Sequence, residues 1–376
     1  MEIRLFKPSL GEEELDSIRA AFERSWVGLG PMVNEFEKKW IEFVGCRDAV
    51  AVNSETAALH LALSAFDFKE GSKVLVPALT FASTATAILY NRLVPVFVDS
   101  DPLTLGISME DLERKYDRNC VAVMPVHYAG HPVEMDVLVP WAREKGLKVI
   151  EDCAHSAVGV YKGKELGRWG DIGCFSFEEK KCMTTGDGGM LTTNNPKYDQ
   201  KFRLWRQHGM SISDTVRHES KKVIFEEYPT TGFNYRMTDI QAAVGIEQLK
   251  RLPELIIERR EIAEKYVNLF KEVPWLASPS EPPYARSNWQ SYPVRLLEDA
   301  PLYRDELMQS LLDMGITTRR GIMNAHQEGA YKDAYYELQH SERASERVIL
   351  LPLFSGSLNE IEKVVGAIRD VGAKYV

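Results

Sequence analysis

The stretch CVAVMPVHYAGHPVEMDVLVPWAREKGLKVIEDC, residues 120–153, indicates the fold. Two short apolar runs, 120–126 and 147–153, enclose a helix-like segment at 134–146. Strands that are apolar along their whole length and alternate with helices are typical of a parallel sheet covered on both faces. Similar runs lie at 73–79, 94–100, 172–177 and 188–194. Together they predict an α/β fold with a mostly parallel sheet.

Two helices are predicted before these strands. Apolar residues at helical spacing favour a helix over 34–44 and a second, more apolar helix over 54–66. Ser54 stands where a serine side chain commonly caps the start of a helix. We therefore expect the second helix to begin directly after Ser54.

The character of the chain changes after about residue 245. A long, charged helical region follows, and Pro253 is expected to interrupt it. Since 376 residues exceed what one compact core usually holds, we predict two domains. These are a large domain at 1–250 and a smaller α+β domain at 251–376. The smaller domain is predicted to contain a strand at 291–297 and helices at 302–314 and 358–371.

Composition narrows the class of protein. A net charge of −9 disfavours a nucleic-acid-binding protein, which needs a basic face for phosphates. The sequence has neither the apolar core of a secretory signal at its start nor an apolar run long enough for a membrane span. The five cysteines lack metal-ligand spacing, which is typical of reduced residues. We expect a cytoplasmic protein without a metal site.

Residues that can bind a ligand follow the predicted strands or lie at the start of the predicted helix at 54–66. Open α/β sheets bind ligands at this edge. The residues at these positions are Thr56, Ala57, Phe81, Glu151, Asp152, His155, Ser176, Lys180 and Lys181. Taken singly, they also suit a helix cap, a core aromatic or surface lysines. Taken together, they offer a helix start for a phosphate, an aromatic ring, a carboxylate and a nucleophilic amine. Pyridoxal phosphate requires this set of groups.

The chain resembles the DegT/DnrJ-type sugar aminotransferases along essentially its whole length. The resemblance rests on motifs that occur in order, including GPMVNEFEKKW, SETAALHLAL, VPALTFASTA, VIEDCAHSAV, GDIGCFSFEEKKCMTTGDGGMLTT, GFNYRMTDIQAAVG and TTRRGIMNAHQ. The segments TTGFNYRMTDIQAA and ITTRRGIM are most similar to perosamine-synthase-like 4-aminotransferases. The family resemblance implies the aspartate-aminotransferase-like (type I) fold and pyridoxal 5'-phosphate as cofactor.

The resemblance also implies roles for residues around the cofactor ring. Asp152 matches the carboxylate that pairs with the ring nitrogen. His155 matches the residue beside the ring's 3-hydroxyl, and Phe81 matches the aromatic residue stacked on the ring. The lysine follows the FSF motif after three further residues, so Lys181 matches the lysine that binds the cofactor covalently. Lys180 falls where the family carries Asn, Thr or Ser, and its role is left open.

Further contacts follow from the same resemblance. Thr56 and Ala57, through their backbone N–H groups, and Ser176 match residues that bind the cofactor phosphate. Asn234 matches a residue that reaches the phosphate of the neighbouring subunit, which implies a homodimer with shared active sites. Glu55 is a departure, because many members carry glycine at this position. A carboxylate repels a phosphate, so we expect the Glu55 side chain to point away from it.

The function implied is the transfer of an amino group from L-glutamate to a nucleotide-linked keto sugar. A 4-keto-6-deoxyhexose is the expected acceptor, in the synthesis of amino sugars for surface polysaccharides such as lipopolysaccharide O-antigen. Arg319, Arg320 and His326 are candidates to contact the diphosphate or the sugar, although the arginine pair also suits a solvated turn. Alternatives are a 3-keto-sugar or cyclitol aminotransferase, and a regulatory protein that binds pyridoxal phosphate without turnover.

Overall fold

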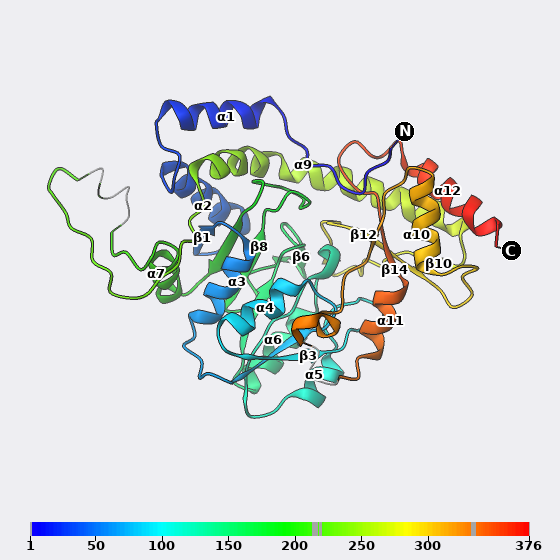
Figure 1. Cartoon of the computed structure of the whole chain (residues 1–376), viewed down its shortest axis with the longest axis horizontal. Coiled ribbons are helices and arrows are strands. Elements are labelled where there is room, and N and C mark those ends of the chain that lie inside the picture. Colours follow the sequence, from blue (N-terminus) through cyan, green and yellow to red (C-terminus); the bar gives the residue numbers. More distant parts are fainter. Residues whose placement is uncertain (1, 213–216, 218–219, 332–335, 376) are drawn as a thin grey trace.

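A seven-stranded sheet forms the centre of the larger part of the molecule (Figure 1). The computed structural model describes residues 2–212, 217, 220–331 and 336–375. The strand order is β1-β9-β8-β5-β4-β2-β3. β9 is antiparallel to both neighbours and the other pairs are parallel, so the predicted mostly parallel sheet is confirmed. The strands are β1 Asp48–Val52, β2 Lys73–Pro77, β3 Val94–Val98, β4 Cys120–Val123, β5 Lys148–Asp152, β8 Ile172–Ser176 and β9 Gly189–Thr193.

Helices cover both faces of this sheet. Ala49 and Ala51 of β1 pack into one core, with residues of α2, α6 and α9, whereas Val50 and Val52 pack into the other, with α3, α4 and α7. This alternation explains why the strands are apolar on both sides. The predicted helices at 34–44, 54–66 and 134–146 are found. The helices are α1 Glu12–Glu23, α2 Pro31–Val44, α3 Glu55–Ser64, α4 Ala82–Tyr90, α5 Met109–Lys115, α6 Met135–Glu144, α7 Pro196–Trp205 and α9 Asp239–Leu269.

The C-terminal part contains a second sheet, which is antiparallel and has the order β10-β12-β14-β13. Helices α10 and α12 pack beside it, and the predicted strand and helices of the smaller domain are found (Figure 1). The elements are β10 Leu276–Ala277, β12 Tyr292–Leu296, α10 Arg304–Asp313, β13 Arg319–Arg320, α11 Gln339–Arg347, β14 Val348–Leu351 and α12 Ile361–Ala373. A small third sheet pairs β11 (Ala285–Arg286) with β6 (Val160–Tyr161), which in turn pairs with β7 (Lys164–Glu165).

Helix α9 connects the two parts and continues through Pro253. The expected interruption there is wrong, because the exposed proline lies on the outer side of the helix and does not end it. Leu252 and Ile256 belong to the core beside the large sheet, whereas Ile262 belongs to the core of the second sheet. The proposed division of the chain near residue 250 therefore falls within a single helix.

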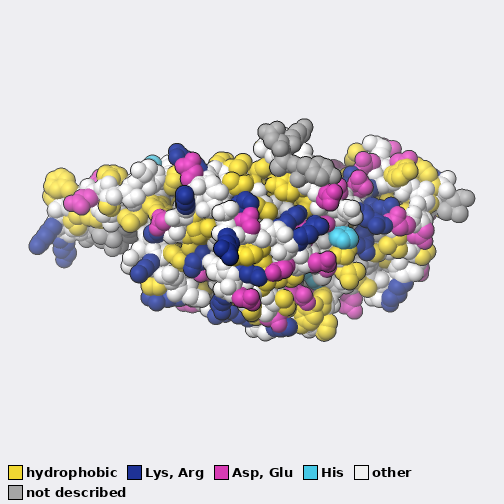
Figure 2. All heavy atoms as spheres, turned by 90° about the horizontal axis from the view of Figure 1, so that it is seen from below, with side chains coloured by type: hydrophobic (Ala, Val, Ile, Leu, Met, Phe, Trp, Pro, Cys, Tyr) yellow, Lys and Arg dark blue, Asp and Glu magenta, His cyan; other side chains and the backbone are white. Residues whose placement is uncertain are grey.

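Acidic and basic side chains are interspersed over the face shown in Figure 2. Among the described residues, no helix combines the length and the apolar character needed to cross a bilayer. Figure 1 also shows an arm that extends away from the body beyond α7, which the chain follows before it enters α9.

A buried ion-pair group joins α2 to α7. Glu37 of α2 is only 3 % exposed, and its Oε2 accepts a hydrogen bond from Arg203 Nη1 at 2.8 Å. Its Oε1 accepts from the N–H of Ala51 at 2.9 Å and also from the buried Arg206. Burial opposes ionisation of Glu37, but the charges of Arg206 and Arg203 outweigh it and hold its pKa below the usual value.

Replacing Glu37 by glutamine is expected to lower the free energy of unfolding by about 3–5 kcal/mol, because Arg206 becomes an uncompensated buried charge. Urea unfolding measures this difference. Since the pKa of Glu37 is lowered in the folded state, its stabilisation is present above the unfolded value of 4.5 and is lost on acidification. The control is Glu35→Gln, which removes an exposed pair with Lys39 and costs less than about 1 kcal/mol. Equal losses in both variants would contradict this role.

Candidate active site

A cavity of about 400 Å³ lies beyond the carboxyl ends of β5 and β8, whose last residues, Asp152 and Ser176, line it. The start of α3, the start of α4, the segment after β8 and strand β13 complete its wall. Both parts of the chain therefore contribute to one cavity. Eight predicted site residues line it: Thr56, Phe81, Asp152, His155, Ser176, Lys181, Arg319 and Arg320.

Asp152 is held by hydrogen bonds at the end of β5, where it is 2 % exposed. Its Oδ2 accepts from Thr84 Oγ1 at 2.8 Å and its Oδ1 accepts from the N–H of Ala154 at 3.1 Å. Thr84 Oγ1 also lies 2.8 Å from Thr80 Oγ1, so Thr80 donates to Thr84 and Thr84 donates to Asp152. These donors stabilise an ionised carboxylate that faces the cavity.

His155 is held as a neutral imidazole. Its Nδ1 accepts a hydrogen bond from the N–H of Ala129 at 3.2 Å, so the proton of the neutral ring resides on Nε2. Ala129 has a φ of 55°, a left-handed conformation that is costly for alanine and that presents this N–H. Burial, followed by the charges of Lys181 and Arg319, lowers the pKa of His155 well below the usual value. His155 can therefore donate a hydrogen bond from Nε2.

Lys180 and Lys181 have different surroundings. Lys180 Nζ pairs with Glu178 Oε1 at 2.8 Å and lies 3.4 Å from Glu179 Oε1, so its charge is balanced within its own segment. The hydrogen bond to Glu178 is the main cause of a raised pKa of Lys180. The side chain of Lys181 is partly buried and lies close to the acidic and histidine groups on the cavity wall.

The backbone on both sides of Lys181 is fixed by Gln290, which comes from the C-terminal part of the chain. Gln290 Nε2 donates to the carbonyl of Lys180 at 2.7 Å, and its Oε1 accepts from the N–H of Cys182 at 2.8 Å. Gln290 is 3 % exposed. Gln290 was not predicted from the sequence, because no local pattern connects it with a lysine about 110 residues earlier.

The start of α3 is built as the sequence predicts. Ser54 caps the helix, and its Oγ accepts from the N–H of Ala57 at 3.2 Å. β9 approaches closely, because a Cβ on Gly189 would lie 2.5 Å from the carbonyl oxygen of Ser54. Thr56 lines the cavity at this helix start, together with Ser176. Ala57 does not line it, and the bond to Ser54 competes with its proposed phosphate contact.

Glu55 also lies on the cavity wall, although its side chain is buried, with 8 % exposure. We expected it to turn away from a phosphate, and the structure places its carboxyl beside that of Asp152. Phe81, in contrast, is 52 % exposed and leaves a ring accessible from the cavity.

The remaining candidates divide into two groups. Arg319 and Arg320 are exposed on β13 and line the cavity, and Arg320 Nη2 lies 3.6 Å from Glu328 Oε1. His326 does not line the cavity, because its ring packs near Phe97 and its Nε2 lies 3.0 Å from Glu342 Oε1. The geometry thus gives no support to a substrate contact by His326.

Asn234 is exposed and also lies outside the cavity. Its carbonyl oxygen accepts a hydrogen bond from Asn53 Nδ2 at 3.3 Å, next to the start of α3. Its predicted contact is with the neighbouring subunit, and that contact stays a prediction.

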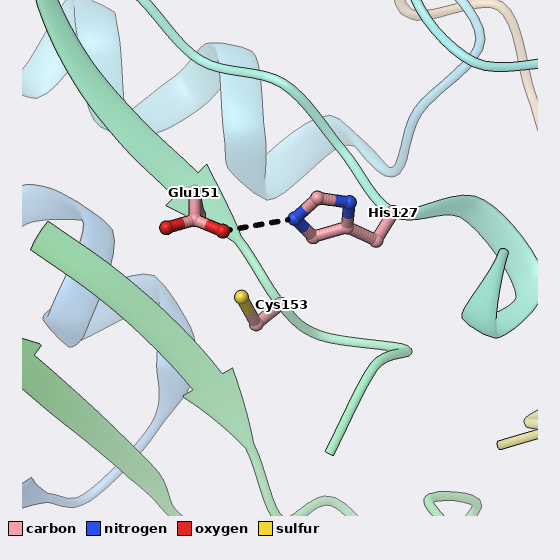
Figure 3. Close-up of side chains that lie close together, drawn as sticks. All are labelled: His127, Glu151 and Cys153. Atoms are coloured by element: carbon pink, nitrogen blue, oxygen red, sulfur yellow. Dashed lines mark hydrogen bonds and ion pairs between the residues drawn. The ribbon is translucent and has the colours of Figure 1, made fainter. Parts of the chain in front are cut away.

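Glu151, the residue before Asp152, anchors a loop on the other face of the sheet. Its oxygens accept hydrogen bonds at 2.7–2.8 Å from three backbone N–H groups within 167–170. Figure 3 shows Glu151 pointing to His127, whose Nε2 lies 3.3 Å away, with Cys153 beside them. His127 Nδ1 accepts a backbone N–H at 3.1 Å. Because these bonds occupy the carboxylate and both ring nitrogens, the group is a structural anchor and not a metal centre.

The groups on the cavity wall fit pyridoxal phosphate. The cavity offers an amine in Lys181, a hydrogen-bonded carboxylate in Asp152 and an accessible aromatic ring in Phe81. His155 adds a neutral hydrogen-bond donor. This set supplies a covalent partner, a counter-charge for the ring nitrogen and a stacking surface.

Comparisons with known proteins identify similar chains. A model of the DegT/DnrJ/EryC1/StrS aminotransferase family matches residues 8–369. The spore coat polysaccharide biosynthesis protein SpsC of Bacillus subtilis is 36% identical over 373 residues, covering 97% of this chain and 95% of SpsC. The aminotransferase TlmJ of Streptoalloteichus hindustanus is 32% identical, with a TM-score of 0.93 and full coverage of both chains.

Two further solved structures are similar over nearly all of the chain. The putative sugar aminotransferase Spr1654 of Streptococcus pneumoniae, in its PLP form, is 25% identical with a TM-score of 0.91 and full coverage of both chains. DesI, solved in the presence of its TDP-sugar product, is 26% identical with a TM-score of 0.90, covering 99% of this chain and 93% of DesI.

The chain therefore belongs to the DegT/DnrJ/EryC1/StrS aminotransferase family. It is a pyridoxal-phosphate-dependent aminotransferase with the type I fold of that family. The predictions of a sugar-aminotransferase family, of its fold and of its cofactor are confirmed.

Proposed function

We propose that the protein transfers an amino group from L-glutamate to a keto sugar carried on a nucleotide, with an NDP-4-keto-6-deoxyhexose as acceptor. The observation that carries the proposal is the shared cavity of Lys181, Asp152 and the Arg319–Arg320 pair. The amine and the carboxylate suit the transfer of an amino group, and two exposed guanidinium groups suit a diphosphate. The TDP-sugar product of DesI and the polysaccharide role of SpsC favour this substrate class.

The residues would divide the binding of the cofactor among them. Lys181 would hold it covalently, Asp152 would pair with its ring nitrogen, and Phe81 would stack on its ring. His155 would donate from Nε2 to the oxygen on the ring. Thr56, at the start of α3, and Ser176 would bind its phosphate. Bound in this way, the cofactor supplies an electron sink for negative charge at the reacting carbon.

Lys181 then has a second task. Once the amine of the donor has taken its place, Nζ is free to remove the proton from the donor's α-carbon and later to return a proton in the other half-reaction. Gln290 keeps Nζ in position, because it fixes the peptide groups before and after Lys181. Lys180 does not compete for this proton transfer, because its charged amine is paired with Glu178. Lys181 is therefore the amine that would carry it out.

Replacing Gln290 by alanine is expected to lower kcat by about tenfold to a hundredfold, because the reacting amine is then less well positioned. The cofactor should still bind, which borohydride trapping on Lys181 measures beside kcat. Gln309→Ala is the matched control, because Gln309 lies on the exposed side of α10 and contacts Asp313. A normal kcat in Gln290→Ala would show that the backbone around Lys181 does not need this support.

A homodimer with shared active sites is part of the proposal. The segment between α7 and α9 carries Val223 and Phe225, which are 85% and 83% exposed. In the same segment, Asn234 forms a β-bridge with Gln207 directly after α7. Exposed apolar residues of this size favour a contact with another chain. A contact between this segment and a second subunit suits the predicted role of Asn234, which is to reach the cofactor phosphate of that subunit.

Replacing Val223 and Phe225 together by aspartate is expected to shift the protein from dimer to monomer, because buried charges disfavour the interface. Sedimentation measures the mass of the particle in solution. The rate of transamination is expected to decrease as the dimer is lost. Val94→Asp, at another exposed apolar position, is the control and should leave the dimer intact. A wild-type protein that sediments as a monomer would refute the shared site.

The substrate is tested in two half-reactions. Conversion of bound cofactor by L-glutamate should release 2-oxoglutarate, and the aminated enzyme should then react with one member of a panel. The panel contains 4-keto-6-deoxyhexoses on GDP, UDP and dTDP, a 3-keto sugar nucleotide and a keto cyclitol. Reaction with only the 3-keto sugar nucleotide or the keto cyclitol would replace the proposed acceptor. If no amino donor converted the bound cofactor, a regulatory protein without turnover would be favoured.

A further inference from the structure

Glu55 is a buried acid that the reaction described so far does not use. It is the first residue of α3, its side chain is 8 % exposed, and it lines the same cavity as Lys181. Its Oε1 is fully buried and meets no hydrogen-bond donor among the described residues. A buried ionised oxygen without a donor is costly, so this position requires another partner.

Asp152 can be this partner, because it lines the same cavity and its carboxyl group lies within hydrogen-bonding reach of that of Glu55. Two ionised carboxylates offer only acceptors and repel each other, so this contact is a hydrogen bond only if one of them carries a proton. Asp152 already accepts from Thr84 Oγ1 and from the N–H of Ala154, and both bonds stabilise its ionised form. The proton therefore belongs on Glu55.

We propose that Glu55 is a protonated carboxylic acid that donates a hydrogen bond to Asp152, and that it is a positioning residue for the carboxylate facing the cofactor. A carboxylate has about four acceptor positions. Thr84, Ala154 and Glu55 then occupy three, which leaves one for the ring nitrogen. The pair carries one negative charge, the charge that a protonated ring nitrogen balances. The role at the cofactor rests on the proposed assignment of Asp152, whereas the shared proton does not.

Groups from several segments face Glu55. Asp152 comes from β5, Lys181 from the segment after β8, and Cys174 from β8 itself. The N–H of Ala154 also points toward it and, like the charge of Lys181, favours its ionised form. Burial, followed by the charge of Asp152, raises the pKa of Glu55 well above its usual value, and Lys181 only partly opposes this.

Infrared spectroscopy of the full-length protein without cofactor tests the shared proton directly. At neutral pH, the wild-type protein should show the C=O band of a protonated carboxyl, and the band should be lost in Glu55→Gln. Glu179→Gln is the matched control, because Glu179 is exposed and lies outside the cavity, so the band should persist. A wild-type spectrum without any band that Glu55→Gln removes would overturn the proposal.

Asp152→Asn provides a second variant, should Glu55→Gln not fold. Without the charge of Asp152, Glu55 ionises more easily, so the pH at which its band disappears should shift downward. An unchanged midpoint would show that Asp152 does not hold the proton on Glu55, and it would refute the pair.

Stability gives an independent measurement. Because the pKa of Glu55 is raised on folding, the folded protein binds more protons than the unfolded chain above pH 4.5, and stability falls as pH rises toward the raised value. Without cofactor, the melting temperature of Glu55→Gln relative to that of the wild type should therefore increase as pH rises. Failure of the proposed function would appear as absent transamination with the carboxyl band intact, so the two failures are distinguishable.

Discussion

Lys181→Ala is expected to abolish transamination, with kcat reduced by more than about a thousandfold. In the proposed function, the variant loses both the covalent partner of the cofactor and the amine that moves the proton at the reacting carbon. Neither loss is compensated nearby, because Lys180 Nζ is held by Glu178 Oε1 at 2.8 Å. Rates with L-glutamate and the accepted keto sugar measure the effect. In the wild-type protein, borohydride should fix the cofactor on the peptide that contains Lys181, and mass analysis of that peptide identifies the modified residue.

Lys180→Ala is the matched control, since it changes the neighbouring residue of the same type. It removes the pairs with Glu178 and Glu179 but leaves the Gln290 bonds on both sides of Lys181. We therefore expect it to retain most of the activity and all of the trapping. If Lys180→Ala were inactive and Lys181→Ala active, the lysine predicted from the spacing after the FSF motif would be wrong.

Asp152→Asn is expected to lower kcat by about a hundredfold to a thousandfold, because the fixed negative charge at the ring nitrogen is lost. The amide is close in size to the carboxylate and can still accept from Thr84, so the fold should be preserved. Activity at saturating substrate is measured beside the content of bound cofactor. The expected pattern is a low kcat with cofactor still bound.

Asp136→Asn is the control for this substitution, because Asp136 contacts Tyr161 outside the cavity. It should leave kcat unchanged. An Asp152→Asn protein with normal kcat would contradict the assignment of Asp152 to the ring nitrogen, whatever the behaviour of Lys181.

Most strands of the large sheet were predictable because they are short apolar runs, and the cores on both faces of the sheet require that pattern. The direction of β9 could not be predicted, because its composition does not distinguish an antiparallel from a parallel partner. An interruption was expected at Pro253, since a proline that faces solvent on a long helix looks in sequence like one that ends it.

The residues of the site that end strands were predictable for a similar reason. Asp152 and Ser176 meet because the carboxyl ends of neighbouring parallel strands share one edge. Gln290 and Thr84 were missed, because their roles depend on contacts between distant segments. His326 was a candidate because its motif lies near Arg320 in sequence, whereas its ring turns to Glu342 and lies outside the cavity.

The end of β5 places two acids on opposite faces of the sheet, with Asp152 at the cavity and Glu151 at the loop 167–170. Loss or gain of a single residue within β5 would exchange the two side chains between these faces. The carboxylate of Asp152 would then point to a loop, and the cavity would receive an acid one methylene longer. We therefore expect point substitutions to be tolerated along this strand far more readily than changes in its length.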